Sequence, residues 1–138
     1  MLALFLKIQV LPESLSIGLF FAVSLFFSVL IGFAIDLIFA SIAIFLKNGC
    51  WAALQIRSAV TSLLSGAVIP FRLMPTSLSK VLTLLPFGAL ANAPLSIYIG
   101  EADTFFLLTI QFFWLIVCWI IAIQLWGKAQ ERMFSFGG

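Results

Sequence analysis

Apolar residues form three long stretches along the chain, separated by short polar or proline-containing segments. The stretches cover residues 17–46, 50–71 and 103–126, and each contains a single charged residue. A helix needs about 20 predominantly apolar residues to cross the roughly 30 Å hydrocarbon core of a bilayer. The pattern therefore predicts three transmembrane helices.

The first stretch is longer than a span requires. A helix over residues 17–46 would be about 45 Å long at about 1.5 Å per residue, so we expect a tilt, a kink near Gly32 or one end among the headgroups. Asp103 or Thr104 can cap the last span. Residues 1–11 are too few to cross and are predicted to form a partial or interfacial helix, and residues 127–138 form a polar tail.

Residues 75–100 are apolar but interrupted by Pro75, Pro86 and Pro94. The prolines divide the segment into two pieces of about 10–14 residues, a length typical of re-entrant or interfacial helices. Irregular backbone at membrane depth has to be covered by protein or to line a cavity. The predicted fold is therefore all-α: one polytopic membrane domain with three transmembrane helices and a re-entrant helical pair before the last span.

The composition supports a membrane location and excludes several functions. Hydrophobic residues make up 64% of the 138 residues and charged residues 9%, whereas soluble domains have about 25% charged residues. The sequence has no cluster of Lys and Arg residues of the kind that binds nucleic acid. With no His and two separate Cys, the sequence offers no metal site and no disulfide framework, and it contains no phosphate-binding P-loop motif.

Asp36 and Arg57 are charges within predicted spans. Counted from the polar turn at residues 47–49, they lie about 15 and 12 Å deep, so in a helical hairpin they can pair. We favour a structural ion pair that fixes the hairpin over a substrate or proton site. A lone charge at that depth would cost about 2.5–3.5 kcal/mol on insertion scales.

The basic residues give a weak indication of orientation. Lys47, Arg57, Lys128 and Arg132 lie on or near one side, and Lys7, Arg72 and Lys80 lie on the other. The positive-inside rule then places the C-terminus in the cytoplasm of a cell-membrane protein. The proline-interrupted segment would lie outside.

The last span contains polar and aromatic residues with two open interpretations. Gln111 and Gln124 can donate interhelical hydrogen bonds, or their amides can face a cavity or the interface. Trp114 and Trp119 lie in mid-span, where packing against lipid or a neighbouring helix is expected.

An ordered series of residues resembles the permease subunits of type-2 ABC exporters, specifically their six-span multidrug-type group. The chain carries LLSGAVIPFRLMP, then SLSKVLTLLPFGALANAPLSIYIGE, then a last span with Gln and Trp. The matching positions are Ser65, Gly66, Ile69, Pro70, Pro75, Leu85, Pro86, Phe87, Pro94, Gly100, Glu101, Gln111, Trp114, Gly137 and Gly138.

The resemblance implies a re-entrant helical pair that shapes the outer exit of a translocation pathway. It also implies a separate cytoplasmic ABC ATPase as partner, so that ATP acts through that partner and no cofactor binds directly to this chain. The resemblance further implies that this chain corresponds to the C-terminal half of such a permease, so a second permease subunit or an N-terminal half is a further expected partner.

Two other functions are weighed against transport. The chain could be a small membrane scaffold without a transport role, or a non-functional truncated permease. An intramembrane enzyme is disfavoured, because the predicted spans offer no His and only one deep acid for general acid–base or nucleophilic chemistry.

Overall fold

The computed structural model describes residues 15–46, 50–100 and 103–136, and all regular structure in these ranges is helical. The predicted all-α class is therefore confirmed. The elements are α2 (Leu15–Phe45), α3 (Cys50–Leu64), the short 3-10 helix η1 (Phe71–Leu73), α4 (Thr76–Leu84), α5 (Asn92–Ile99) and α6 (Thr104–Phe136).

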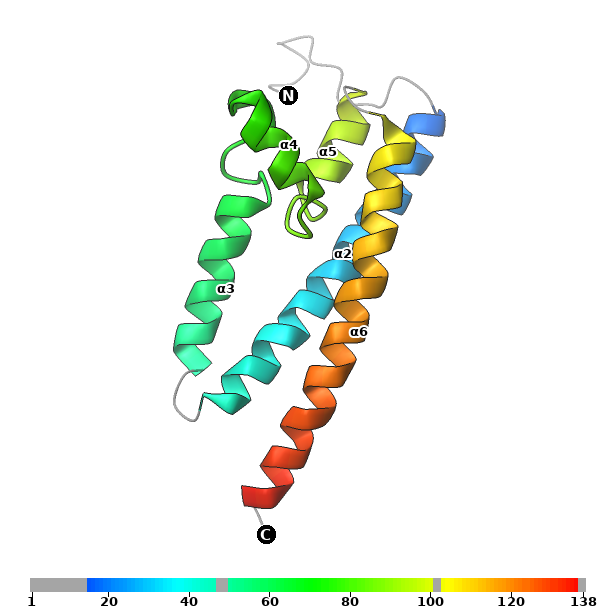
Figure 1. The fold of residues 1–138 in the computed structure, drawn as a ribbon. Coiled ribbons are helices and arrows are strands. Elements are labelled where there is room, and N and C mark those ends of the chain that lie inside the picture. The colour runs from blue at the N-terminus through cyan, green and yellow to red at the C-terminus, as the bar shows by residue number, and fades with distance from the viewer. Residues whose placement is uncertain (1–14, 47–49, 101–102, 137–138) are drawn as a thin grey trace, which may run out of the picture.

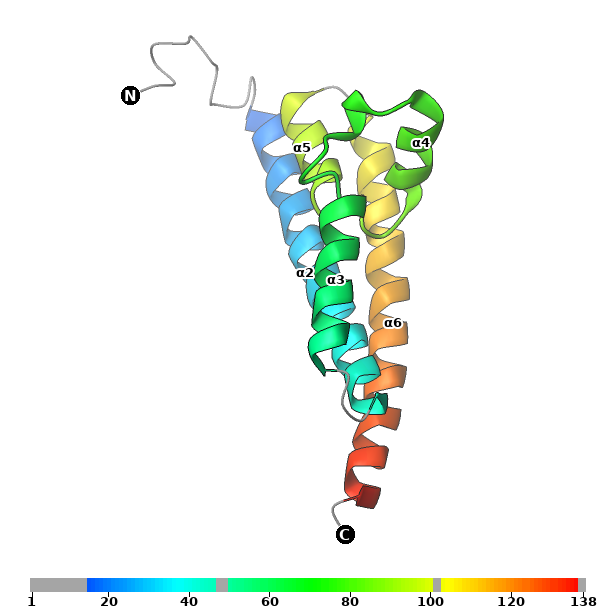
Figure 2. The same ribbon diagram turned by 90° about the vertical axis from the view of Figure 1, so that its left-hand side faces the viewer.

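The two longest helices, α2 and α6, lie side by side and run in the same direction (Figures 1 and 2). Both are long and apolar enough to cross a membrane. Their shared core contains small side chains, with Ala34 and Ala122 fully buried and Cys118 nearly so. Small residues let two helix backbones approach closely, which is the usual basis of helix association in lipid.

Helix α3 returns the chain toward the end of the molecule where α2 begins (Figure 1). It has 15 residues, about 22 Å at 1.5 Å per residue, and ends at Leu64. The prediction of one helix over residues 50–71 was therefore wrong, and the described part of the chain holds two helices of spanning length rather than three. Gly66 adopts a left-handed φ of 80°, and Pro70 has no backbone N–H for a helical bond.

Helices α4 and α5 are the two short helices of the segment predicted to be re-entrant, and they are called the re-entrant pair below. The first runs from the upper end toward the middle of the molecule and the second returns (Figures 1 and 2). Pro75 directly precedes α4, and Pro94 lies in the first turn of α5, where no helical N–H bond is lost. Gly100 ends α5 with a φ of 75°. Its N–H group donates hydrogen bonds to Ile97 O and Ser96 O.

Helix α6 begins at a capped end and continues past the predicted boundary at residue 126. Asp103 Oδ1 accepts a hydrogen bond from the N–H of Phe105 at 3.1 Å, as expected of an N-cap. The helix extends to Phe136, because residues 128–132 are good helix formers. Arg132 lies 5.4 Å from the centre of the Phe45 ring and so connects this extension to the end of α2.

Several predictions fall outside the described residues. They are the interfacial helix at 1–11, the turn at 47–49, Glu101 and the glycine pair at 137–138. Helix α2 is continuous from Leu15 to Phe45, and the alternatives of a tilt, a kink near Gly32 or an end among the headgroups stay predictions.

Candidate functional site

Gln111 lies at the centre of a buried polar cluster that joins α2, α6 and the re-entrant turn at residues 85–91. Its side chain is fully buried. Its amide Nε2 lies 2.9 Å from Ala89 O and 3.0 Å from Ser28 Oγ. Ser24 Oγ donates to Gln111 Oε1 at 2.8 Å. The predicted interhelical hydrogen bonding of Gln111 is therefore confirmed.

Ser28 completes the cluster from the side of α2. Its hydroxyl lies 2.8 Å from Ala89 O and 2.9 Å from Ser24 O. The carbonyl of Ala89 is thus within hydrogen-bond distance of two side chains from two different helices. In a lipid environment an unsatisfied backbone carbonyl costs several kcal/mol, so these donors stabilise the turn at its depth between the long helices.

Trp114, one helical turn after Gln111, makes a second hydrogen bond between α6 and the re-entrant pair. Its indole N–H donates to Leu84 O at 2.8 Å. Leu84 is the last residue of α4, and the last carbonyls of a helix have no partner within the helix. Trp114 therefore contacts a neighbouring helix, which is one of the two alternatives expected from the sequence, and it gives a partner to a carbonyl at the end of that helix.

The segment after α3 packs on the start of α5 around Phe71. Ser65 O accepts a hydrogen bond from Asn92 N at 3.1 Å, and Phe71 is 2% exposed. A Cβ added at Gly66 would lie 3.1 Å from the Phe71 ring, and one at Gly88 would lie 2.4 Å from Leu82 O. Gly88 is therefore required by the close approach of a backbone atom, and Gly66 is favoured by its left-handed φ of 80° together with the nearby Phe71 ring.

The other predicted gate residues lie in the same region. Pro70 precedes η1, and Pro86 and Phe87 lie in the re-entrant turn. Phe87 packs against the core cluster of α2 and α6. The turn that carries Pro86 and Phe87 therefore meets Gln111 through Ala89 O, and the end of α4 meets Trp114 through Leu84 O, whereas Pro75 and Gly100 lie at the far ends of α4 and α5.

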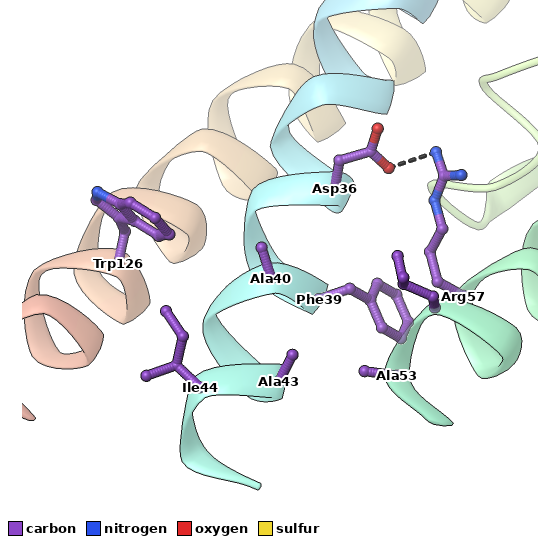
Figure 3. A pocket seen from close by; sticks show the side chains of 9 residues that line it. Asp36, Phe39, Ala40, Ala43, Ile44, Ala53, Arg57 and Trp126 are labelled. Carbon is purple, nitrogen blue, oxygen red and sulfur yellow. Dashed lines mark ion pairs between the residues drawn. The ribbon is translucent and has the colours of Figure 1, made fainter. Parts of the chain in front are cut away.

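Asp36 and Arg57 form an ion pair that connects α2 with α3 (Figure 3). Arg57 Nη2 contacts Asp36 Oδ1, and the side chains of Arg57 and Asp36 remain 35% and 46% exposed. Asp36 lies eight residues beyond Ser28, about 12 Å along the axis of α2. The ion pair is thus a separate feature from the Gln111 cluster.

Sequence reasoning did not identify Ser24 and Ser28 as members of the cluster. They are four residues apart in an otherwise apolar helix, so they share one face. That spacing was an available signal, but the Ser28 partner Ala89 O is a backbone atom with no signature in the sequence.

No group of three or more potential metal ligands occurs among the residues that the structure describes. Cys118 is a free thiol buried between α2 and α6, where a cysteine packs as a small hydrophobic residue.

Comparison with known proteins identifies a family. The family model described as an ABC-2 family transporter protein matches residues 3–137. No curated protein and no solved structure matches the chain. Permease subunits of this family lack ATPase activity. Because the match covers almost the whole sequence, the chain belongs to the ABC-2 family, as a membrane component of an ABC transporter.

Proposed function

We propose that the chain is a permease component of an ATP-driven exporter of the six-span multidrug-type group and forms part of the translocation pathway. The family match supports a transporter membrane component. The observation that carries the finer proposal is the turn at 85–91, held between two long helices by Gln111, Ser28 and Trp114.

The re-entrant pair would act as a fixed element at the outer exit of the pathway. Its turn is anchored to α2 and α6 at once, so it moves with these helices. Helix α3 is attached differently: it packs mainly on α2 and is joined to that helix by the Asp36–Arg57 pair. A relative movement of α3 would therefore change the pathway while leaving the exit structure intact.

The proposed partners follow from the family and from the exposed surface. A cytoplasmic ABC ATPase would supply energy, so ATP would act through that subunit. Large apolar side chains are exposed along α3, including Trp51, Leu54, Ile56 and Leu63. In the cell membrane these would face lipid, a second permease subunit or an N-terminal permease half, with the C-terminus in the cytoplasm.

The proposal is tested by purifying the tagged chain from native membranes in mild detergent and identifying co-purifying proteins by mass spectrometry. We expect an ABC ATPase together with permease sequence that supplies further spans. ATP hydrolysis by the purified complex should fall in Gln111→Leu and remain unchanged in Gln124→Leu, whose side chain is exposed. Stable recovery of the chain without any ATPase would support the scaffold function instead.

A further inference from the structure

A cavity of about 520 Å³ lies beside the ion pair, between α2, α3 and one residue of α6 (Figure 3). Its volume falls within the roughly 300–1,000 Å³ typical of small-molecule sites. Three alanines leave the space open: Ala40 and Ala43 on α2 and Ala53 on α3. The larger lining residues are Phe39, Ile44, Leu54 and Trp126.

The polar groups of the cavity are Asp36 and Arg57, and their pairing leaves hydrogen-bonding capacity unused. A guanidinium group has five N–H donors, and one contact between its Nη2 and Asp36 is observed. The Arg57 Nε is buried and has no partner among the described residues. The pair therefore has spare donors on Arg57, while its net charge is zero.

We propose that this cavity binds a small, net-neutral amphipathic molecule. Its apolar body would pack against Phe39, Ala43 and Trp126, and an uncharged acceptor such as an amide carbonyl would receive a hydrogen bond from Arg57. A charged ligand would remain uncompensated beside a neutral pair, and an unpaired charge at membrane depth is costly. The acyl chain of a bilayer lipid would fill the apolar part but would offer no acceptor to Arg57.

The inference goes beyond the proposed export function, because binding can be measured without ATP or transport. The full-length chain, in its native membranes, is photolabelled with a diazirine-bearing N-methyl dodecanamide. Probes with the same alkyl chain and a trimethylammonium or a sulfonate head are compared with it. Labelled peptides are identified by mass spectrometry, and unlabelled amide serves as competitor.

The matched variants are Ala43→Phe, which fills the cavity, and Ala52→Phe, which adds the same ring at an exposed position that does not line it. We expect saturable amide labelling of the cavity residues and an apparent affinity reduced about tenfold in A43F, equivalent to about 1.4 kcal/mol. The A52F variant should label like the wild type. Ala40→Phe provides a second cavity-filling variant if A43F does not accumulate.

A double variant tests the polar part of the proposal. Asp36→Leu with Arg57→Leu keeps the cavity neutral but removes every side-chain N–H donor from it, and we expect it to weaken labelling by the amide while the charged probes remain excluded. Equal labelling in A43F and A52F, non-saturable labelling, or stronger labelling by either charged probe would each overturn the inference. Non-saturable labelling would identify ordinary bilayer lipid as the occupant.

Discussion

Among the described residues, Gln111 is the one on which most of the buried side-chain hydrogen bonds converge. Its amide approaches Ala89 O and Ser28 Oγ, and its carbonyl accepts from Ser24. Hydrogen bonds between membrane helices average only about 0.6 kcal/mol each, so no single contact dominates. Leaving several polar groups unsatisfied at once is more costly, because each loses its partner in a region without water.

We therefore expect Gln111→Leu to lower the free energy of unfolding by about 1–3 kcal/mol. The substitution retains a similar side-chain volume but removes the Gln111 amide, which is the donor from α6 to Ala89 O. Gln124→Leu is the matched control on the same helix and should change stability by no more than about 0.5 kcal/mol. Unfolding by a denaturing detergent in mixed micelles measures both. Equal stabilities of the two variants would show that the cluster does not hold the turn.

Gly88 gives a steric counterpart to this polar prediction. A Cβ at this position would lie 2.4 Å from the carbonyl oxygen of Leu82, a backbone atom that cannot move without shifting α4. We expect Gly88→Ala to cost about 1–3 kcal/mol, as overpacking does. Gly127→Ala, where a Cβ meets nothing within 4 Å, should be neutral or stabilising by up to about 1 kcal/mol. The same unfolding assay distinguishes them, and a neutral G88A would contradict the observed packing.

At the scale of the elements, the sequence predicted which helices exist better than where they end. The apolar stretches and the prolines at 75, 86 and 94 predicted the two long helices and the re-entrant pair. The end of α3 could not be predicted in this way, because residues 65–70 leave the helix to pack on α5, where Ser65 O meets Asn92 N. Such a contact between distant residues outweighs local apolar periodicity.

The predicted end of α6 at residue 126 was too early, whereas the predicted end of α3 was too late. The sequence after residue 126 is polar and was interpreted as a tail, yet its residues favour helix locally, and Ala129 is buried. Polarity showed where the apolar part of the helix ends but not where the helix itself ends. The Asp36–Arg57 pairing was anticipated from depth alone, since both residues were counted from the same turn.

The pairing of α2 with α3 can be tested by a double-mutant cycle. Asp36→Asn or Arg57→Gln alone leaves the opposite charge without a partner, and we expect each to weaken assembly, with an upper cost of about 2.5–3.5 kcal/mol for a fully inserted charge. The double variant should recover most of the loss. The fraction of monodisperse protein extracted from membranes is the measurement. Additive effects of the two substitutions would show that the charges act independently.

For the whole molecule, the arrangement of the helices determines which segments share a side of the membrane. The chain passes along the long axis in α2, α3 and α6, whereas α4 and α5 enter and leave at the end where α2 begins (Figure 1). Helix α4 has nine residues, about 13 Å, which is less than half of the hydrocarbon core. The hairpin is therefore too short to cross, and its two ends should face the same compartment.

Cysteine accessibility tests this arrangement and the proposed orientation together. In a chain with Cys50 and Cys118 replaced by alanine, Lys80→Cys and Ile99→Cys mark the two sides of the re-entrant turn, and Lys128→Cys marks the end of α6. All three native side chains are exposed. We expect an impermeant maleimide added outside intact cells to label positions 80 and 99, and to label position 128 only after permeabilisation. Labelling of 80 and 99 from opposite sides would mean that the hairpin crosses the membrane. Labelling of 128 alone from outside would leave the hairpin re-entrant but reverse the orientation, because the ends of α4 and α5 lie opposite the end of α6.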